Sequence, residues 1–341
     1  MISFRDAIHY SLMVMLFCAV ISCAPRSEGP RVVGSVAFPE LSGPYLGQAT
    51  PGAEPVLFAP GVISTGLAEL NSVFTPDGGE FYYAVDIGVD WVIMVTRQTD
   101  GTWSPPEVAS FTRDGSGVDL CISSDGDRLF YCSNRSRTGG AVPESNMDIW
   151  YVNRVDDGSW SAPVNLAAVN SDWAEFYPCL TDDDTLYFLS RRPGGYGGGD
   201  IYRSRLVNGR YTEPENLGPV INNSGNQGDA FVAPDESYLI FNSRGHDTAP
   251  GYGSLYISFR DADDSWSPPK NLGVAMTADR SDFCPMLSPD GKYFLFSSAR
   301  PRFGAGGAIT WQSLHEAQSR PENGNTDLYW VDASFIDQLR P

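Results

Sequence analysis

The chain has 341 residues, of which 42 are Asp or Glu and 23 are Lys or Arg, so its formal net charge is −19. An electrostatic field of that sign repels phosphate backbones and anionic headgroups, which argues against a nucleic-acid partner. The 35 Gly and 25 Pro residues are typical of an all-β protein with many tight turns, and one repeat along most of the chain indicates a single closed array.

An export signal is predicted at the amino terminus. Apolar residues dominate positions 12–21, a run that is long enough for a signal-peptide core and too short to span a bilayer. The run leads into Val20-Ile21-Ser22-Cys23, which resembles the lipobox of bacterial lipoproteins, in which the Cys becomes the lipidated first residue of the mature protein. We expect a lipoprotein signal peptide over 1–22 and lipidation at Cys23, with ordinary secretion as the alternative.

A segment rich in Pro and Gly follows at 23–53 and shows no sustained hydrophobic period. We expect it to be a tether that packs along the folded domain. The domain itself is expected over 54–335, and a short carboxyl-terminal tail over 336–341.

Five repeats form this domain. In each, an apolar strand leads into a turn with Asp at its third position and then into a second apolar strand. The turn aspartates are separated by 48, 58, 52 and 55 residues, a period expected of propeller blades. They are Asp77, Asp125, Asp183, Asp235 and Asp290.

The strands are apolar nearly throughout, as a sheet covered on both faces requires. The fifth repeat ends without a fourth strand, and residues 54–61 resemble the Pro-Val-Asn-Leu and Pro-Glu-Asn-Leu strands that finish the other repeats. Pairing of this segment with the last repeat would close the ring and remove an exposed sheet edge. We therefore predict an all-β, five-bladed β-propeller closed by an N-terminal strand in the last blade.

The repeat pattern resembles a known family. It runs from a Pro/Ser-x-Asp-Gly turn through an apolar strand, Ser-x-Arg, a Gly-rich loop and Asp-Ile-Tyr to Trp-x-x-Pro-x-Asn-Leu, and it covers 54–335. This is similar to the WD40-like β-propeller repeat of the Tol-B type. The resemblance implies an exported propeller that binds a protein or another ligand on one face.

An acidic residue precedes each turn Asp, by eight positions in repeats one, three and five and by six in repeats two and four. Because two positions preserve the face of a strand, we expect all five carboxylates around one mouth of the central channel, as candidate binding groups. Their mutual repulsion would raise some pKa values or recruit a cation. They are Glu69, Asp119, Glu175, Asp229 and Asp282, and Tyr177 is expected among them.

Arginines lie near the ends of four second strands, at the same mouth. Three of the following strands open with Asp148, Asp200 or Asp327, so ion pairs that hold neighbouring blades are the simplest role, with ligand binding as the alternative. The arginines are Arg135, Arg192, Arg244 and Arg300.

The long loop at 301–325 emerges on the same face and holds Trp311, which could offer a stacking surface or pack its own loop down.

Few residues offer metal or nucleophile chemistry. Only three His are present, and no Gly-x-Ser-x-Gly sequence occurs, so we assign no catalytic residue, metal or cofactor. Four cysteines lie inside predicted strands, where we expect buried free thiols, although a disulfide between Cys121 and Cys132 is possible.

The leading hypothesis is a non-catalytic lipoprotein of the cell envelope, periplasm-facing and held at the outer membrane by its lipid alone. It would bind an envelope protein, peptide or glycan as a monomer. The alternative is a glycosidase-like enzyme in which Glu69 and Glu175 supply acid and base, by analogy with five-bladed propellers that use paired carboxylates. A structural array without a small ligand is the third possibility.

Overall fold

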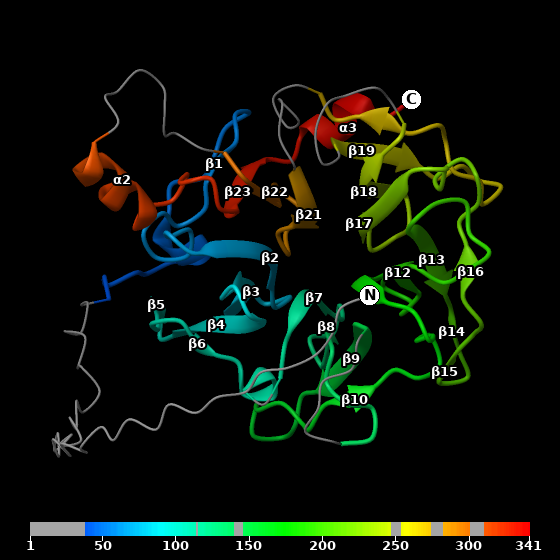
Figure 1. The fold of residues 1–341 in the computed structure, drawn as a ribbon, viewed down its shortest axis with the longest axis horizontal. Helices are drawn as coiled ribbons and strands as arrows, with labels where there is room; N and C mark the ends of the chain where they lie inside the picture. The colour runs from blue at the N-terminus through cyan, green and yellow to red at the C-terminus, as the bar shows by residue number, and fades with distance from the viewer. Residues whose placement is uncertain (1–37, 114, 140–145, 247–253, 274–281, 301–309) are drawn as a thin grey trace, which may run out of the picture. The chain divides into compact units, whose positions relative to one another are not determined.

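The computed structural model describes residues 38–113, 115–139, 146–246, 254–273, 282–300 and 310–341. The predicted signal peptide and Cys23 lie outside these residues. Within residues 38–341, five antiparallel sheets follow one another along the chain and stand in a ring (Figure 1). The predicted five-bladed propeller is confirmed.

Each blade is one sheet whose first strand is innermost. Blade 1 contains β2 (Ala68–Phe74), β3 (Glu80–Asp86), β4 (Trp91–Thr99) and β6 (Glu107–Val108), with β5 (Thr102–Trp103) extending the end of β4. Blade 2 contains β7 (Val118–Ile122), β8 (Arg128–Ser133), β9 (Asp148–Asn153) and β10 (Val164–Asn165). Blade 3 contains β11 (Glu175–Leu180), β12 (Leu186–Ser190), β13 (Asp200–Ser204) and β16 (Glu215–Asn216), and the hairpin of β14 (Leu206–Val207) and β15 (Arg210–Tyr211) precedes its last strand.

Blade 4 contains β17 (Asn226–Val232), β18 (Tyr238–Arg244), β19 (Ser254–Phe259) and β20 (Lys270–Asn271). Blade 5 contains β21 (Asp282–Leu287), β22 (Tyr293–Ser298), β23 (Asp327–Asp332) and the N-terminal β1 (Val56–Leu57). Short helical segments join or flank the sheets: η1 (Pro44–Gly47), η2 (Ser110–Thr112), α2 (Trp311–Gln318) and α3 (Phe335–Leu339). None of the helices in the described part of the chain is long and apolar enough to cross a membrane.

The turn aspartates fix the inner hairpins. The Thr75 hydroxyl donates to Asp77 Oδ1 at 2.6 Å, and the Gly79 N–H donates to the same oxygen at 2.9 Å. The hydroxyls of Ser123 and Thr181 donate to Asp125 and Asp183 in the same way. These hydroxyl bonds lower the pKa of the aspartates because they favour the charged carboxylate. For Asp77, the bond from the Gly79 N–H is the second cause of the lowered pKa.

Every innermost strand contains a β-bulge. At each bulge one non-glycine residue, six positions before the turn Asp, adopts a left-handed backbone with φ between 43° and 57°. An L-residue rarely adopts that conformation, so its recurrence in all five blades marks a built feature of the fold. The five residues are Asn71, Asp119, Tyr177, Asp229 and Cys284.

The ring closes through the N-terminal strand, as predicted. β1 pairs antiparallel with β23, with Val56 opposite Trp330, and the Phe58 N–H donates to the Leu328 carbonyl at 2.8 Å. Phe58 is fully buried, and its ring lies 4.9 Å from that of Phe81 and 5.2 Å from that of Trp330. A single side chain therefore contacts both blade 1 and blade 5 at the junction.

The described part of the predicted tether also packs on this junction. The Tyr45 ring lies 5.6 Å from Phe74 of blade 1 and 5.1 Å from Tyr293 of blade 5. The Gly43 carbonyl accepts bonds from the side chains of Gln98 and Trp103, both at 2.8 Å. Residues 43–48 thus form a strap across the two blades that meet at the closure.

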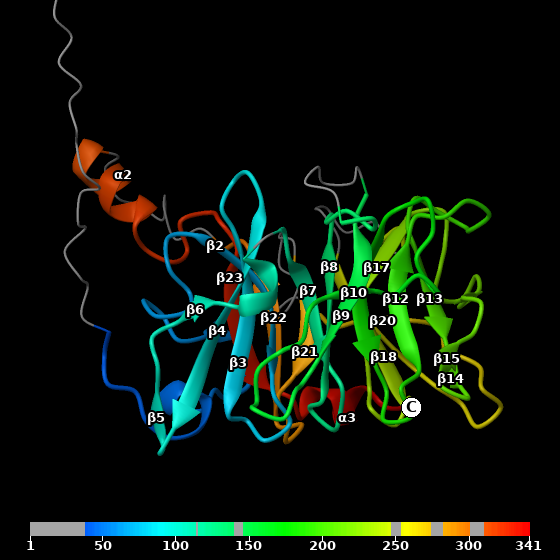
Figure 2. The same ribbon diagram turned by 90° about the horizontal axis from the view of Figure 1, so that it is seen from below.

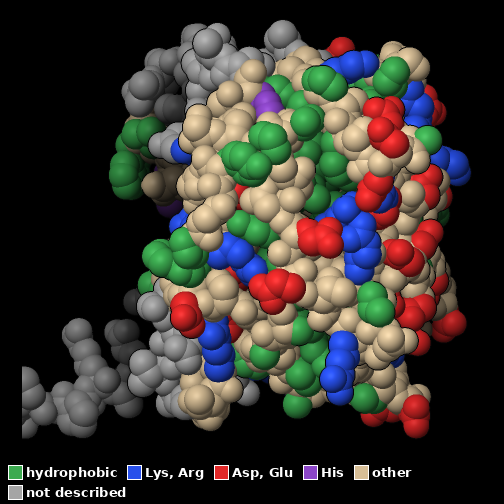
Figure 3. Space-filling model, turned by 90° about the vertical axis from the view of Figure 1, so that its right-hand side faces the viewer, with side chains coloured by type: hydrophobic (Ala, Val, Ile, Leu, Met, Phe, Trp, Pro, Cys, Tyr) green, Lys and Arg blue, Asp and Glu red, His purple; other side chains and the backbone are tan. Residues whose placement is uncertain are grey.

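Ion pairs join neighbouring blades near their outer edges. Arg154 of blade 2 pairs with Glu80 of blade 1 at 2.5 Å, and Arg203 of blade 3 pairs with Asp264 of blade 4 at 3.2 Å. Figure 3 shows acidic and basic side chains next to one another on one side of the molecule. Because such pairs are partly exposed, each contributes little to stability, and the packed strands carry most of it.

The two ends of the propeller differ. Helix α2 lies at the end where the innermost strands begin, and α3 lies at the end where the Asp turns stand (Figure 2). Ile336 of α3 is buried, and the Phe335 ring packs 5.5 Å from Phe294. The predicted carboxyl-terminal tail is therefore in part a helix packed on blade 5.

Candidate functional site

The five acidic residues predicted to form one ring occupy two structural positions. Glu69, Glu175 and Asp282 lie near the start of the innermost strand, whereas Asp119 and Asp229 are the left-handed residues of the bulge. A bulge interrupts the alternation of each innermost strand, so residues an even number of positions apart are not equivalent there, and the prediction of one ring was wrong in this respect. We call the first three the outer carboxyls.

The outer carboxyls are buried, and Glu69 and Glu175 hold the loops that precede their strands. Glu175 accepts bonds from the Ser171 N–H at 3.0 Å, the Ser171 hydroxyl at 2.6 Å and the Ser190 hydroxyl at 2.7 Å. Glu69 accepts from the N–H and hydroxyl of Thr65, also four residues earlier. Burial raises the pKa of Glu69 to about 7 despite these bonds.

Two of the predicted arginines pair with carboxyls of their own blade, and a third contacts a backbone carbonyl and an aromatic ring. Arg192 lies 3.3 Å from Glu175, and Arg300 lies 3.4 Å from Asp282, so both pair with outer carboxyls of the same blade. Arg135 donates to the Phe111 carbonyl at 2.9 Å and lies over the Trp150 ring. Arg244 is exposed at the end of β18.

The aspartates that open the third strands have other partners. Asp148 pairs with Arg137 rather than Arg135, through two bonds of 2.5 and 2.6 Å. Asp200 accepts from two backbone N–H groups of its own Gly-rich loop, and Asp327 accepts from the Glu322 N–H at 2.7 Å. In the described part of the chain, the ion pairs of Arg154 and Arg203 join neighbouring blades.

The bulge residues form a belt that crosses from blade to blade. Asn71 Oδ1 accepts from the Leu120 N–H of blade 2 at 2.6 Å, and Asp119 Oδ2 accepts from the Tyr177 N–H of blade 3 at 3.2 Å. The Tyr177 hydroxyl donates to the Pro285 carbonyl of blade 5 at 2.7 Å. We call this set, which is Asn71, Asp119, Tyr177, Asp229 and Cys284, the inner belt.

Two carboxyls of the inner belt, Asp119 and Asp229, have raised pKa values. Burial is the main cause of the raised pKa of Asp119, and the negative charge of Asp229 is the second cause. Burial also raises the pKa of Asp229. Both groups therefore hold protons above the pH at which an exposed aspartate ionises. The Tyr177 side chain is fully buried, and its bond to blade 5 crosses the inner end of the propeller.

Several exposed apolar side chains lie on the loops at the end where the innermost strands begin. Trp311 on α2 is 81% exposed, and its ring stacks on His315 at 5.9 Å. Trp173, which precedes β11, and Tyr196, in the Gly-rich loop after β12, are each about half exposed. We call this end the loop face, and its exposed apolar residues are Leu67, Ile87, Val89, Trp173, Tyr196, Val220, Trp311 and Leu314.

Of these residues, only Trp311 was predicted from the sequence as a candidate binding residue. Trp173 and Tyr196 could also have been predicted, because they are aromatic residues in connecting segments, where a buried partner is not expected. Within the described ranges, no group of three or more His, Cys, Asp or Glu side chains stands close enough to hold a metal ion.

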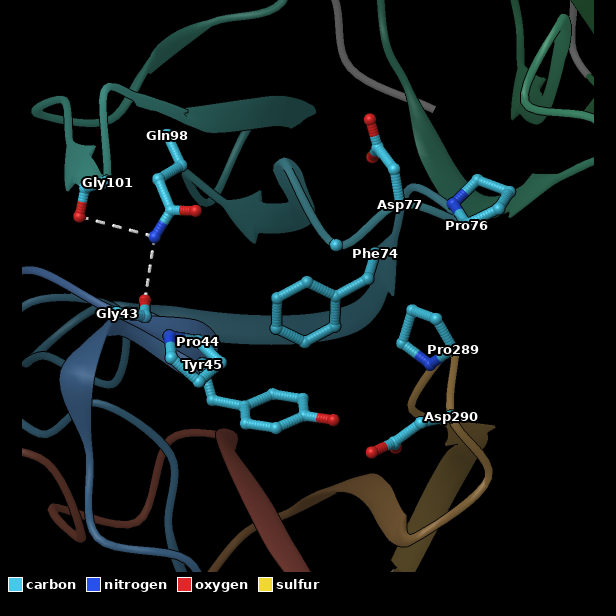
Figure 4. Close-up of a pocket in the computed structure, with 11 residues that line it drawn as sticks. Gly43, Pro44, Tyr45, Phe74, Pro76, Asp77, Gln98, Gly101, Pro289 and Asp290 are labelled. Atoms are coloured by element: carbon cyan, nitrogen blue, oxygen red, sulfur yellow. Dashed lines mark hydrogen bonds between the residues drawn. The ribbon is translucent and has the colours of Figure 1, made fainter.

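A pocket of about 420 Å³ lies beside the strap at the opposite end. Figure 4 shows Tyr45 between Phe74 of blade 1 and the Pro289-Asp290 turn of blade 5, with its hydroxyl toward the turn. The pKa of the Tyr45 hydroxyl is raised to about 12, mainly by burial and secondly by a hydrogen bond with Asp290. The Tyr45 hydroxyl therefore stays protonated and bonded, which supports a structural role for the strap.

Comparison with known proteins returns structures but no sequence family. No family model and no curated protein matches the chain. TolB from Acinetobacter baumannii is 15% identical, with a TM-score of 0.44, over 78% of this chain and 57% of that protein. A putative TolB from Agrobacterium tumefaciens is 15% identical, with a TM-score of 0.46, over 77% of this chain and 90% of that one.

An enzyme is found among the similar structures as well. An alpha-L-arabinofuranosidase from Lactobacillus brevis is 12% identical, with a TM-score of 0.46, over 79% of this chain and 91% of that protein. TolB proteins are thus among the structural matches, as the repeat pattern led us to expect. At such identities and TM-scores, the function has to be argued from this chain's own residues.

Proposed function

We propose that this chain is a non-catalytic binding module of the cell envelope and that its loop face takes a protein or peptide. The observation that carries this proposal is the set of exposed aromatic and aliphatic side chains on the loop face. Large aromatic side chains at exposed positions are typical of interface anchors, because they bury much apolar area at a small entropic cost.

The state of the acidic residues supports a binding role over a glycosidase role. A glycosidase needs two carboxyls that reach the sugar from either side. Glu69 and Glu175 are both buried and accept bonds from the residues four positions earlier, so neither could reach a sugar without movement of those loops.

The loop-face proposal is tested by removing its two exposed tryptophans. The Trp173→Ala/Trp311→Ala variant should bind its envelope partner at least about tenfold more weakly, since truncating an aromatic anchor costs about 2 kcal/mol or more. Partners are captured from envelope extract with the mature domain, identified by mass spectrometry, and then titrated in purified form.

The matched control is Val155→Ala/Val207→Ala, which truncates exposed side chains in hairpins at the other end of the propeller. The control should bind as the unmodified chain does. Equal affinity in all three proteins would contradict the proposal. Capture that survives protease treatment of the extract would point to a glycan, and cleavage of polysaccharides in a panel would favour the enzyme alternative.

Envelope anchoring is proposed from the lipobox-like sequence. In a bacterial host, the Cys23→Ser variant should fail to incorporate a tagged fatty acid and should leave the membrane fraction, since the acyl chains supply the membrane affinity. The matched control is Cys18→Ser, which lies inside the predicted signal peptide and should keep the label. Labelling that persists in Cys23→Ser would contradict lipidation at this position.

A further inference from the structure

A groove of about 750 Å³ lies beside the closing strand of blade 5. One wall is the outer edge of β1 with residues 55–57, and the other is helix α2 with the residues that follow it. Glu322 and Tyr329 also line the groove. We infer that this groove binds an extended, basic peptide, which adds to the edge of β1 and places a Lys or Arg side chain against Asp327.

Helix α2 presents to the groove a different side from the one that carries Trp311. Ser313, Glu316 and Ala317 line the groove, and their spacing of three and four residues places them on one side of the helix. With 3.6 residues per turn, Trp311 and Gln318 lie on the opposite side. The groove is therefore separate from the aromatic anchors of the loop face, and the inference does not depend on the proposed function.

The outer edge of β1 offers backbone groups at Leu57. Val56 lies opposite Trp330 in an antiparallel register, and the Phe58 N–H donates to the Leu328 carbonyl at 2.8 Å. Successive residues of a strand direct their N–H and C=O groups to opposite sides, so those of Leu57 point away from β23. Because β1 is the outermost strand of its sheet, no strand in the described part of the chain pairs with this side. An extended peptide can bond with such an edge as an added strand.

In blades 2 and 3, the Asp that opens the third strand has an Asn partner from the fourth strand. Asn165 Nδ2 donates to Asp148 at 2.7 Å, and Asn216 Nδ2 donates to Asp200 at 2.7 Å. Each Asn directly precedes the residue whose N–H bonds with the third strand, and in blade 5 that position is occupied by Leu57. A leucine side chain has no donor, so blade 5 cannot form this bond.

Asp327 is the equivalent carboxyl of blade 5, and it is 1% exposed. Its Oδ2 accepts from the Glu322 N–H at 2.7 Å, whereas its Oδ1 has no hydrogen-bond partner among the described residues. Burial raises the pKa of Asp327 to about 6, so the group is mostly ionised at neutral pH. A buried carboxylate oxygen without a donor is unfavourable, and the ammonium or guanidinium of a ligand would supply that donor.

The charges at the groove also favour a basic ligand. Glu316 of α2 and Arg320 form an exposed ion pair at 3.7 Å, so their charges largely cancel. The other charged residue that lines the groove is Glu322, whose Oε1 accepts from the Tyr329 hydroxyl at 3.2 Å and whose N–H bonds with Asp327. The remaining charges are therefore negative, and they would attract a Lys or Arg side chain.

The test begins with phage-displayed random heptapeptides. These are selected on the mature domain and counter-selected on Ala317→Trp, in which the indole fills the groove from α2. Peptides that require the open groove should share a Lys or Arg, and replacing that residue by norleucine should weaken binding at least about tenfold. The matched control is Gln318→Trp, on the opposite side of α2, which should bind these peptides as the unmodified chain does.

Leu57→Asn tests the role of Asp327. The introduced amide should donate to Asp327, as Asn165 and Asn216 donate to their aspartates, so a selected peptide should bind at least about tenfold more weakly. Leu57→Met is the control, because it alters the same side chain without adding a donor, and its affinity should be unchanged. Thermal melting checks that both variants are folded.

Methylation of the peptide's backbone nitrogens, one at a time, tests the added strand. One internal methyl group should weaken binding at least about tenfold and its neighbours should have little effect, since adjacent N–H groups of a strand point to opposite sides. Equal affinities of Leu57→Asn and Leu57→Met would overturn the proposal, as would a library without groove-dependent peptides or uniform tolerance of methylation. Peptides that depend on Trp173 and Trp311 instead would overturn the groove site and support the loop face.

Discussion

Replacing Phe58 by alanine is expected to lower the free energy of unfolding by about 3–5 kcal/mol, the usual cost of truncating a fully buried Phe. The Phe58 side chain is fully buried and contacts the rings of Phe74, Phe81 and Trp330. Its loss opens a cavity between blade 1 and blade 5, where the ring closes. Chemical denaturation of the mature domain measures the change.

The matched control for this prediction lies two residues away. Val56 occupies the same closing strand, but its side chain is 45% exposed. Val56→Ala should therefore change the free energy of unfolding by less than about 1 kcal/mol. If Phe58→Ala were no more destabilising than Val56→Ala, the closing strand would not stabilise the ring.

Asp119→Asn is expected to change how stability depends on pH between pH 5 and 8. The folded-state pKa of Asp119 is raised by burial and by Asp229, so the folded chain keeps a proton that the unfolded chain has already released. A raised carboxyl pKa means that stability falls as pH rises from the unfolded value, near 4, through the folded value. The slope is about 1.4 kcal/mol per pH unit for each extra proton bound by the folded state.

Asparagine does not ionise, and its carbonyl oxygen can still accept the Tyr177 N–H bond that Asp119 accepts at 3.2 Å. The melting temperature of Asp119→Asn should therefore exceed that of the unmodified chain at pH 8, and this advantage should disappear toward pH 5. In Asp119→Asn, stability should still fall somewhat as pH rises, because burial raises the pKa of Glu69 to about 7. Thermal melting at half-unit pH steps measures both proteins.

Asp157→Asn is the control for this experiment. Asp157 is exposed, and a hydrogen bond from Ser159 lowers its pKa, so it is ionised in both the folded and the unfolded state above pH 5. The substitution should leave the pH dependence unchanged. If Asp119→Asn and the unmodified chain had parallel profiles, Asp119 would not carry a proton in the folded protein.

The raised pKa values also bear on the role of the acidic residues. The sequence predicts one ring of five carboxylates that bind a ligand. In the structure, Asp119 and Asp229 belong to the inner belt, which joins blades, and Glu69 and Glu175 hold loops. A binding role for these acids stays a proposal, and the exposed side chains of the loop face give the better-supported surface.

The five-bladed architecture could be predicted from the sequence alone. The turn Asp recurs at a blade-length period, each Asp fixes a hairpin through bonds to residues within two positions, and residues 54–61 supply the strand missing from the fifth repeat. These features are local or periodic, so a single sequence reveals them. The closing strand could be predicted because an unpaired edge strand is unfavourable and only one segment resembles the missing strand.

Which side chains contact one another becomes visible only in the folded chain. The left-handed residue at each bulge places Asp119 and Glu175 in different environments, although both precede a turn Asp by an even number of residues. The bond from the Val232 N–H to the Cys179 sulfur, at 3.4 Å, joins residues 53 positions apart in neighbouring blades, which strand alternation alone cannot reveal. The physical reason is that alternation fixes a side chain's face within one strand, whereas backbone conformation at a bulge and packing between sheets fix its partners.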